Sequence, residues 1–250
     1  MNPWSSVATP KRLVPPDWWR LQPGVEKRYT RPMSDPFDLI TSNDLDSLRA
    51  ELSRDPELAR ARHPGGASLV AWCAYMGNVG AIAAVRALLP EIDPHEAIIL
   101  KDGERLEAAL ANGWDANALS HDGFTPLGLA AFFDNAEAFE LLLPLTRDVN
   151  EAAKNPQQVA ALHAATAKRN TRMVEKLLRA GADPSRAQAD GFTPLHVAAM
   201  HGDTAIVGLL LLFGADPRQA NAKGEDAIAH ANNGGHAWLA ERLARWDARN

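Results

Sequence analysis

The chain has 250 residues, of which 46% are hydrophobic and 23% are charged, with 26 basic against 31 acidic side chains. These fractions exclude a wholly disordered chain, and the single cysteine, Cys73, excludes a disulfide scaffold. The net charge of −5 argues against a nucleic-acid partner. Because we find neither a secretory signal nor an apolar run of roughly 20 residues, we expect a cytoplasmic protein that has no membrane partner.

Residues 1–32 differ in composition from the rest of the chain. They hold three of the seven tryptophans, several prolines, and six basic against two acidic side chains, which leaves 20 basic and 29 acidic side chains for residues 33–250. Because the segment has no helical periodicity, we expect a flexible or loosely docked arm. Its positive charge would also allow it to bind the acidic body or an acidic partner.

Helix signals begin immediately after this arm. Asp35 is expected to cap a first helix that starts at Pro36, where the missing N–H of proline costs nothing. Short apolar runs at helical spacing then recur to the C-terminus, separated by Gly, Asn, Asp and Pro, and no segment keeps the alternation typical of strands. The pattern predicts an all-α fold made of short helices.

Two motifs recur with the same period. Residues 122–127, Asp-Gly-Phe-Thr-Pro-Leu, are repeated letter for letter at residues 190–195, an offset of 68, or twice 34. Gly-Ala-Asp-Pro occurs at residues 181–184 and again 33 residues later. Two motifs in phase indicate a tandem repeat of about 33 residues.

These residues resemble the ankyrin repeat, whose signature Thr-Pro-Leu-His-x-Ala precedes two antiparallel helices and a turn. Residues 193–198 match that signature in full, and the match weakens toward both ends of residues 33–250. The resemblance implies an ankyrin-repeat solenoid of about seven stacked helix-turn-helix units with β-turn fingers. We expect units starting near residues 36, 68, 94, 125, 160, 193 and 226.

Several positions of the repeat have a physical role that can be argued directly. Thr193 can cap the inner helix by accepting a hydrogen bond from a free N–H, and Pro194 suits the first helical position. Since the span from Gly103 to Gly113 is two residues shorter than the span from Gly202 to Gly214, we expect a truncated outer helix in the third unit.

A single helix pair exposes apolar faces on both sides, so the units must stack, and the terminal units need a polar outer face. In the last unit we therefore expect an outer surface of Glu241, Arg242 and Arg245. The apolar residues of that unit are expected to face inward; they are Trp238, Leu239 and Leu243.

The sequence predicts no catalytic, cofactor or metal site. The resemblance implies that His163 and His196 hydrogen-bond between adjacent repeats, and His95-Glu96 lacks the second histidine of a zinc protease motif. Nucleophile elbows, phosphate loops and dinucleotide fingerprints are missing, and Cys73 occupies a small-residue slot of the helix. Basic residues between positions 168 and 179 are expected on a solvated helix face.

The predicted binding surface consists of positions that follow the paired small residues on the inner helices. In a stacked array these positions line the concave face, and several are aromatic or sulfur-containing, as interface cores favour. The alternative is that Phe132 or Met200 packs between repeats. The predicted partner-binding residues are Tyr75, Met76, Phe132, Phe133, Lys168, Met200 and His201 on the helices, with Leu119, His121, Arg186 and Gln188 in the fingers.

We therefore expect a non-enzymatic module that binds a protein partner, as a monomer or weak homodimer. Two alternatives remain from the sequence. The first is an enzyme with an unrecognised site, which a pocket of convergent titratable groups would reveal. The second is a scaffold whose N-terminal arm acts as a lid or dimerisation strap, which deletion of residues 1–32 would test.

Overall fold

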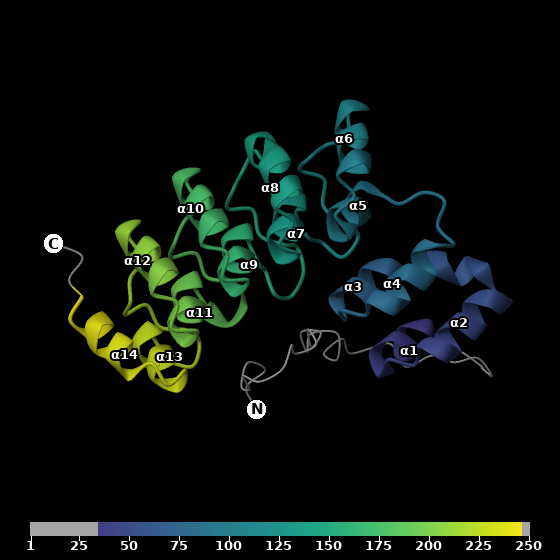
Figure 1. Cartoon of the computed structure of the whole chain (residues 1–250). Coiled ribbons are helices and arrows are strands. Elements are labelled where there is room, and N and C mark those ends of the chain that lie inside the picture. The colour runs from purple at the N-terminus through teal and green to yellow at the C-terminus, as the bar shows by residue number, and fades with distance from the viewer. Residues whose placement is uncertain (1–34, 247–250) are drawn as a thin grey trace. The chain divides into compact units, whose positions relative to one another are not determined.

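The computed structural model describes residues 35–246, so the arm expected at residues 1–32 lies outside the described residues. The described part contains fourteen short α-helices and, besides them, only 3₁₀ turns and two isolated β-bridges (Figure 1). It divides into two compact units, of which the first ends at Leu100 and the second begins at Lys101. The all-α class predicted from the helical periodicity is confirmed.

The first unit contains two helix pairs and one further helix. Within it, α1 packs against α3, α2 against α4, and α3 against α5. Its helices are α1 (Pro36–Ser42), α2 (Leu45–Arg54), α3 (Leu69–Tyr75), α4 (Val79–Arg86) and α5 (Pro94–Leu100), with a 3₁₀ turn, η2 (Pro56–Arg60), after α2.

Trp72 anchors the core of the first unit. Its ring is 4% exposed, stacks on His63 at 4.5 Å between centroids, and meets Phe37 edge-on at 5.8 Å. Its indole Nε1–H donates to the Thr41 hydroxyl at 3.2 Å, so its polar atom is also satisfied. The neighbouring Cys73 is fully buried, as expected for a small core residue, and burial raises the pKa of its thiol to about 12.

The second unit is a series of stacked helix pairs (Figure 1). Each inner helix packs on the inner helix of the next pair: α7 on α9, α9 on α11, and α11 on α13. Its helices are α6 (Gly103–Ala111), α7 (Pro126–Phe132), α8 (Ala136–Leu142), α9 (Ala161–Ala167), α10 (Thr171–Arg179), α11 (Pro194–Met200), α12 (Thr204–Leu212), α13 (Ala227–Asn233) and α14 (Ala237–Ala244), with 3₁₀ turns η3 (Leu143–Leu145) and η4 (Ala189–Gly191).

The inner helices can be compared with the predicted unit starts. The inner helices α1, α3, α5, α7, α9, α11 and α13 each begin within one residue of an expected unit start. Each is seven residues long. The small apolar faces of these helices are buried against their neighbours, so the core is divided among the interfaces between repeats.

Two threonines at equivalent positions start their helices differently. The Thr125 hydroxyl accepts a hydrogen bond from the N–H of Gly128 at 3.0 Å, as expected for a cap. At the equivalent place, the Thr193 hydroxyl instead contacts Nδ1 of His196 at 2.8 Å, and the same nitrogen accepts from the Thr193 N–H at 2.9 Å. Thr193 is therefore the N-cap residue of α11, as expected, and its partner in the capping box is the imidazole of His196, which the glycine at position 128 cannot supply.

The turn between inner and outer helix requires one residue with a left-handed backbone. Glycine fills this position in three of the seven described turns, and Asn43, Lys101, Asp134 and Arg169 fill it in the others. A left-handed backbone costs a residue with a Cβ about 1–2 kcal/mol.

Each of these four left-handed residues is also hydrogen-bonded to the turn of a neighbouring repeat, which offsets the cost. The bonds are Asn78 to Asn43 (3.1 Å), Lys101 to the Asp134 carbonyl (2.9 Å), Asn170 to the Asp134 carboxylate (2.6 Å) and Arg169 to Asp203 (3.2 Å).

These turns also correct the prediction of a truncated third outer helix. Helix α6 has nine residues, as many as α12. The equivalent of Gly202 (φ 65°) is Lys101 (φ 58°), whereas Gly103 is the first residue of α6. The prediction was wrong because it aligned Gly103 with Gly202, two residues out of register.

We predict that Thr166→Ala stabilises the second unit. Thr166 is fully buried on α9 and its hydroxyl has no hydrogen-bond partner among the described residues. The adjacent repeats place Ala131 and Ala199 at this position, so alanine fits the slot. Since a buried unsatisfied hydroxyl costs about 1–3 kcal/mol and the lost methyl offsets part of the gain, the free energy of unfolding should rise by about 1 kcal/mol in urea denaturation.

The matched control is Ala199→Thr, which introduces a hydroxyl at the equivalent position of α11 and should lower the free energy of unfolding. A loss of stability in Thr166→Ala would show that the Thr166 methyl contributes more than its hydroxyl costs.

Candidate protein-binding surface

Three of the predicted binding residues form one cluster in the second unit. Phe132 ends α7 and Phe133 follows it; both rings are half-buried and meet edge-on with 5.1 Å between centroids. Lys168, directly after α9, places its Nζ 4.8 Å from the centre of the Phe132 ring. We call Phe132, Phe133 and Lys168 the cation–aromatic cluster.

Lys168 holds a positive charge in a partly desolvated place. Desolvation by burial lowers the pKa of its ammonium, and the positive charge of Lys101 lowers it further, whereas Asp134 acts in the opposite direction. Within residues 35–246 no hydrogen bond or ion pair joins Lys168 to a carboxylate. The face of the Phe132 ring therefore supplies a favourable contact for this ammonium.

Met200 and His201 occupy the same positions one repeat further along. Met200 ends α11 and His201 follows, and both side chains are half-buried. Desolvation lowers the pKa of His201, and the charge of Arg169 lowers it further. The buried Nδ1 of His201 has no hydrogen-bond partner among the described residues. Met200 and His201 thus lie one repeat beyond Lys168, at the equivalent positions of their helix.

Tyr75 and Met76 belong to the first unit. Both are partly buried and pack against its hydrophobic core. Their exposed area is therefore only a part of each side chain.

The fingers of the second unit form a backbone-bonded row. Each turn is closed by its own hydrogen bond, from Ser120 N–H to Phe124 C=O (2.9 Å), Gln188 to Phe192 (2.8 Å) and Asn221 to Glu225 (2.9 Å). Neighbouring fingers are also joined, from Lys154 N–H to Gly123 C=O (2.8 Å), Ala189 to Gln157 (3.0 Å) and Ala222 to Asp190 (2.8 Å). The predicted residues Leu119, His121, Arg186 and Gln188 lie in this row, where His121 is exposed and the other three are half-buried.

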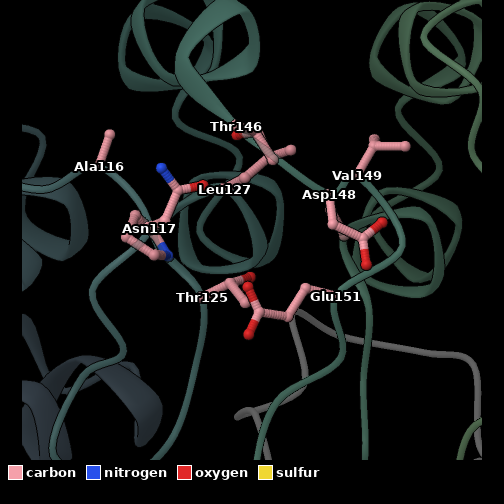
Figure 2. Close-up of a pocket in the computed structure, with 10 residues that line it drawn as sticks. Ala116, Asn117, Thr125, Leu127, Thr146, Asp148, Val149 and Glu151 are labelled. Atoms are coloured by element: carbon pink, nitrogen blue, oxygen red, sulfur yellow. The ribbon is translucent and has the colours of Figure 1, made fainter.

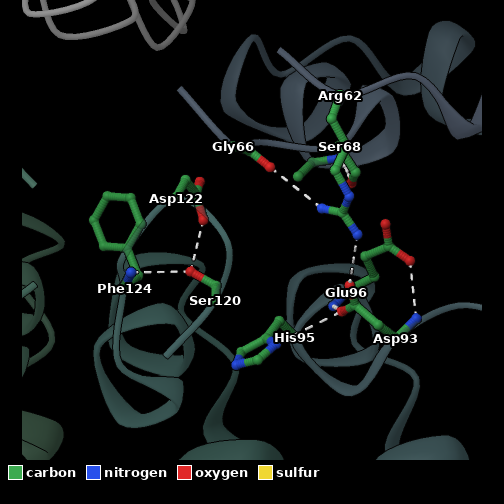
Figure 3. A network of polar contacts seen from close by, with 10 residues as sticks. Arg62, Gly66, Ser68, Asp93, His95, Glu96, Ser120, Asp122 and Phe124 are labelled. Atoms are coloured by element: carbon green, nitrogen blue, oxygen red, sulfur yellow. Dashed lines mark hydrogen bonds and ion pairs between the residues drawn. The ribbon is translucent and has the colours of Figure 1, made fainter. Parts of the chain in front are cut away.

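Side chains rigidify two of the turns. In the second unit the Ser120 hydroxyl donates to Asp122 at 2.6 Å and accepts from the Phe124 N–H at 2.9 Å (Figure 3). In the first unit Asp93 and Glu96 cap each other's N–H groups at the start of α5, each at 2.9 Å, and Arg62 reaches Asp93 at 3.5 Å (Figure 3). The Asp-x-x-Glu spacing of residues 93–96 was a signal for this cap that our sequence analysis missed.

His163 and His196 connect adjacent repeats, as the resemblance implied. The Nδ1 atom of each ring accepts from the backbone N–H at the start of its own helix. Nε2 of His163 then donates to the Arg186 carbonyl at 3.0 Å, and Nε2 of His196 donates to the Gln219 carbonyl at 2.9 Å. Both bonds join a helix to the following finger, so a neutral imidazole holds each finger in place.

Two cavities were not anticipated from the sequence. One lies between a finger and the loop after α8, is lined by Thr125, Asp148 and Glu151 among others, and has a volume of about 10 Å³ (Figure 2). That volume holds about one water molecule and is far below the roughly 300–1,000 Å³ of a ligand pocket. The other is an open groove of about 950 Å³ between α12 and α14.

The basic residues of α10 are paired, as expected for a solvated face. Arg172 and Lys176 contact Glu140, and Arg179 contacts Glu175 at 2.8 Å. In the part of the chain that the structure describes, no three His, Cys, Asp or Glu side chains are placed to share a metal ion. Across the same residues we find no helix whose length and hydrophobicity would allow it to cross a bilayer.

We predict that protonation of His163 destabilises the second unit in acid. Burial lowers the pKa of this imidazole from 6.5 to about 4. Below pH 6.5 the unfolded chain binds a proton that the folded chain does not, so stability is complete above pH 6.5 and falls as the pH decreases toward 4. The shift corresponds to about 3 kcal/mol at most.

Urea denaturation between pH 7.5 and 4.5 measures this loss. His163→Gln should flatten the pH dependence, whereas His121→Gln, which changes an exposed finger histidine, should leave it as in the wild type. An equal pH slope in the wild type and in His163→Gln would contradict the assignment.

Comparison with known proteins supports the repeat assignment. A model of ankyrin repeats (3 copies) matches residues 94–188 and 162–249, which together are more than half of the chain. A search of curated proteins returned no match. The phase of the helices, the histidine bonds between repeats and this match lead to one conclusion: the chain belongs to the ankyrin-repeat family.

Proposed function

We propose that the protein binds a protein partner through the predicted concave face, with the cation–aromatic cluster at its centre. Ankyrin repeats generally mediate protein–protein interaction and are typically non-enzymatic. The proposed surface contains the cluster, Met200 and His201, with the finger residues Leu119, His121, Arg186 and Gln188 at its rim. In the first unit the equivalent positions are Tyr75 and Met76, through the parts of their side chains that the core leaves uncovered.

The observation that carries this proposal is the half-buried state of the cluster. Folding alone would favour complete burial of Phe132 and Phe133 and complete hydration of Lys168. Instead, two aromatic rings are left partly accessible beside an ammonium that has lost part of its hydration. A partner that covers the rings buries additional apolar area. An anionic group on that partner can contact an ammonium that has already lost part of its hydration.

Rigidity supports the same interpretation. The finger row is joined by backbone hydrogen bonds, and the helix turns are joined by Lys101, Asp134 and Arg169. Because these bonds fix the positions of the surface residues before binding, little conformational entropy is lost when a partner docks. The cavity beside the fingers is only water-sized, so it does not offer a substrate pocket at the proposed surface.

Quantitative affinity purification from the native cell tests this proposal. The wild type, Phe133→Ala, Lys168→Glu and the control Leu145→Ser would be compared, since Leu145 is 48% exposed and lies outside the proposed surface. We expect both cluster variants to lose a common partner by at least about tenfold, because contacts at an interface centre contribute most of the affinity. The control should retain that partner.

Thermal denaturation of the same variants distinguishes binding from folding. Lys168→Glu should unfold close to the wild-type temperature, because its charge is held by a ring rather than by an ion pair. Retention of every partner by both cluster variants would contradict the proposal, and so would partner loss that simply follows the unfolding temperature. The role of residues 1–32 as a lid or strap stays a separate prediction.

A further inference from the structure

A groove between α12 and α14 is a second surface of the second unit. Figure 1 shows these two outer helices near the C-terminal end of the described chain. One face of α12 forms the floor of the groove, with Thr204, Val207, Gly208 and Leu211 at helical spacing. Helix α14 and the residues after it form the opposite wall, with Trp238, Arg242, Arg245 and Trp246 among its lining residues. The volume of about 950 Å³ is large enough to receive several side chains.

Two exposed apolar side chains line this groove. They are Trp238 (50%) and Trp246 (36%); two further exposed hydrophobic residues, Leu212 (75%) and Phe213 (37%), lie at the C-terminal end of α12. The prediction that Trp238 faces inward was therefore wrong, although Leu239 and Leu243 are buried as expected. The terminal repeat lacks the fully polar outer face that a solvent-facing cap needs.

Helix α12 is also unlike the other outer helices of the described chain. Each of α2, α4, α6, α8, α10 and α14 contains at least one charged residue, whereas α12 (Thr-Ala-Ile-Val-Gly-Leu-Leu-Leu-Leu) contains none. A helix that is apolar on all sides is typical of a buried position. Its outward face therefore lacks the polar cover that a helix in permanent contact with water normally has.

Gly208 is the sharpest indication that something else covers this face. A Cβ atom at Gly80 or Gly103, which also lie in outer helices, would approach the Leu45 side chain to 2.7 Å or the Glu137 carboxylate to 2.6 Å. A Cβ at Gly208 would meet nothing within 4 Å. Since glycine inside a helix is less stable than alanine, the fold gives no reason for Gly208. Its missing side chain leaves the groove floor open to the close approach of another backbone.

The charge of the groove wall indicates the kind of partner. Arg242 on α14 and Arg245 directly after it are exposed, and neither is paired with a carboxylate within residues 35–246. Arg218 donates to the carbonyls of Ala244 (3.0 Å) and Trp246 (3.1 Å), which fixes the end of the wall. Glu241 is the acidic residue in the lining. The groove thus combines an apolar floor with a positive rim, in a chain whose net charge is −5.

We propose that this groove binds an amphipathic α-helix of a partner protein that has an acidic flank. Apolar residues at positions i, i+3, i+4 and i+7 of that helix would cover Val207, Gly208, Leu211 and Trp238, and its carboxylates would pair with Arg242 and Arg245. The surface is distinct from the cation–aromatic cluster, so the two sites can fail independently.

Two synthetic helical peptides test the proposal with the full-length chain. Both carry leucine at i, i+3, i+4 and i+7; one has glutamate on its flanks and the other has lysine. Tryptophan fluorescence and calorimetry should show the glutamate peptide binding at least about tenfold more tightly than the lysine peptide. A variant with both Arg242→Glu and Arg245→Glu should reverse this preference.

Changes at Gly208 separate binding from folding. Gly208→Ala should raise the unfolding temperature, because alanine favours the helix, and should weaken peptide binding, because its methyl group occupies the groove. Gly208→Leu should abolish binding. Lys168→Glu should leave peptide binding unchanged, because it alters the other proposed surface.

Any one of three results would overturn the proposal: equal affinity for both peptides, no binding of either peptide at concentrations up to ~1 mM, or unchanged peptide binding in Gly208→Leu. Sedimentation showing a dimer that Gly208→Leu dissociates would identify a second copy of the chain as the occupant instead. Binding that requires prior deletion of residues 1–32 would identify the chain's own arm as the occupant.

Discussion

Burial of small apolar faces between successive inner helices is the interaction on which the rest of the structure depends. Leu195, Ala198 and Ala199 of α11 are each at most 1% exposed, and α11 packs on both α9 and α13. No helix pair has a core of its own, so each repeat is stable only as part of the series. The histidine bonds, the finger row and the hydrogen-bonded turns then fix the register that this packing creates.

The same constraint leaves two surfaces incomplete. At the ends of the inner helices, the side chains of the cation–aromatic cluster are only half-buried. On the outer helices, α12 and α14 leave a groove beneath Trp238 and beside Gly208. The first surface lies on the inner helices and the second on the outer helices, so the two are separate surfaces of the second unit.

Much of the fold could be predicted from the sequence because the ankyrin signature sets the phase of every repeat. The helix starts followed directly from it, as did the burial of Cys73 and the bonds of His163 and His196. The errors arose where a residue departs from the repeat pattern. Lys101 takes a left-handed position that glycine fills in three of the seven turns, and Trp238 is exposed where helical periodicity placed it inside. Periodicity shows which face a residue is on, but it cannot show whether a neighbour covers that face.

The central claim is that adjacent repeats stabilise each other. Hydrogen exchange on a variant at the interface between two repeats tests this claim most directly. Ala198, 1% exposed, would be changed to leucine to overfill the packing around α11. If the repeats share one core, amide protection should fall in α9 and α13 as well as in α11, and less in α7, which does not pack on α11. A loss of protection confined to α11 and α12, with α9 and α13 as protected as in the wild type, would show that each helix pair is stable by itself and would contradict the account.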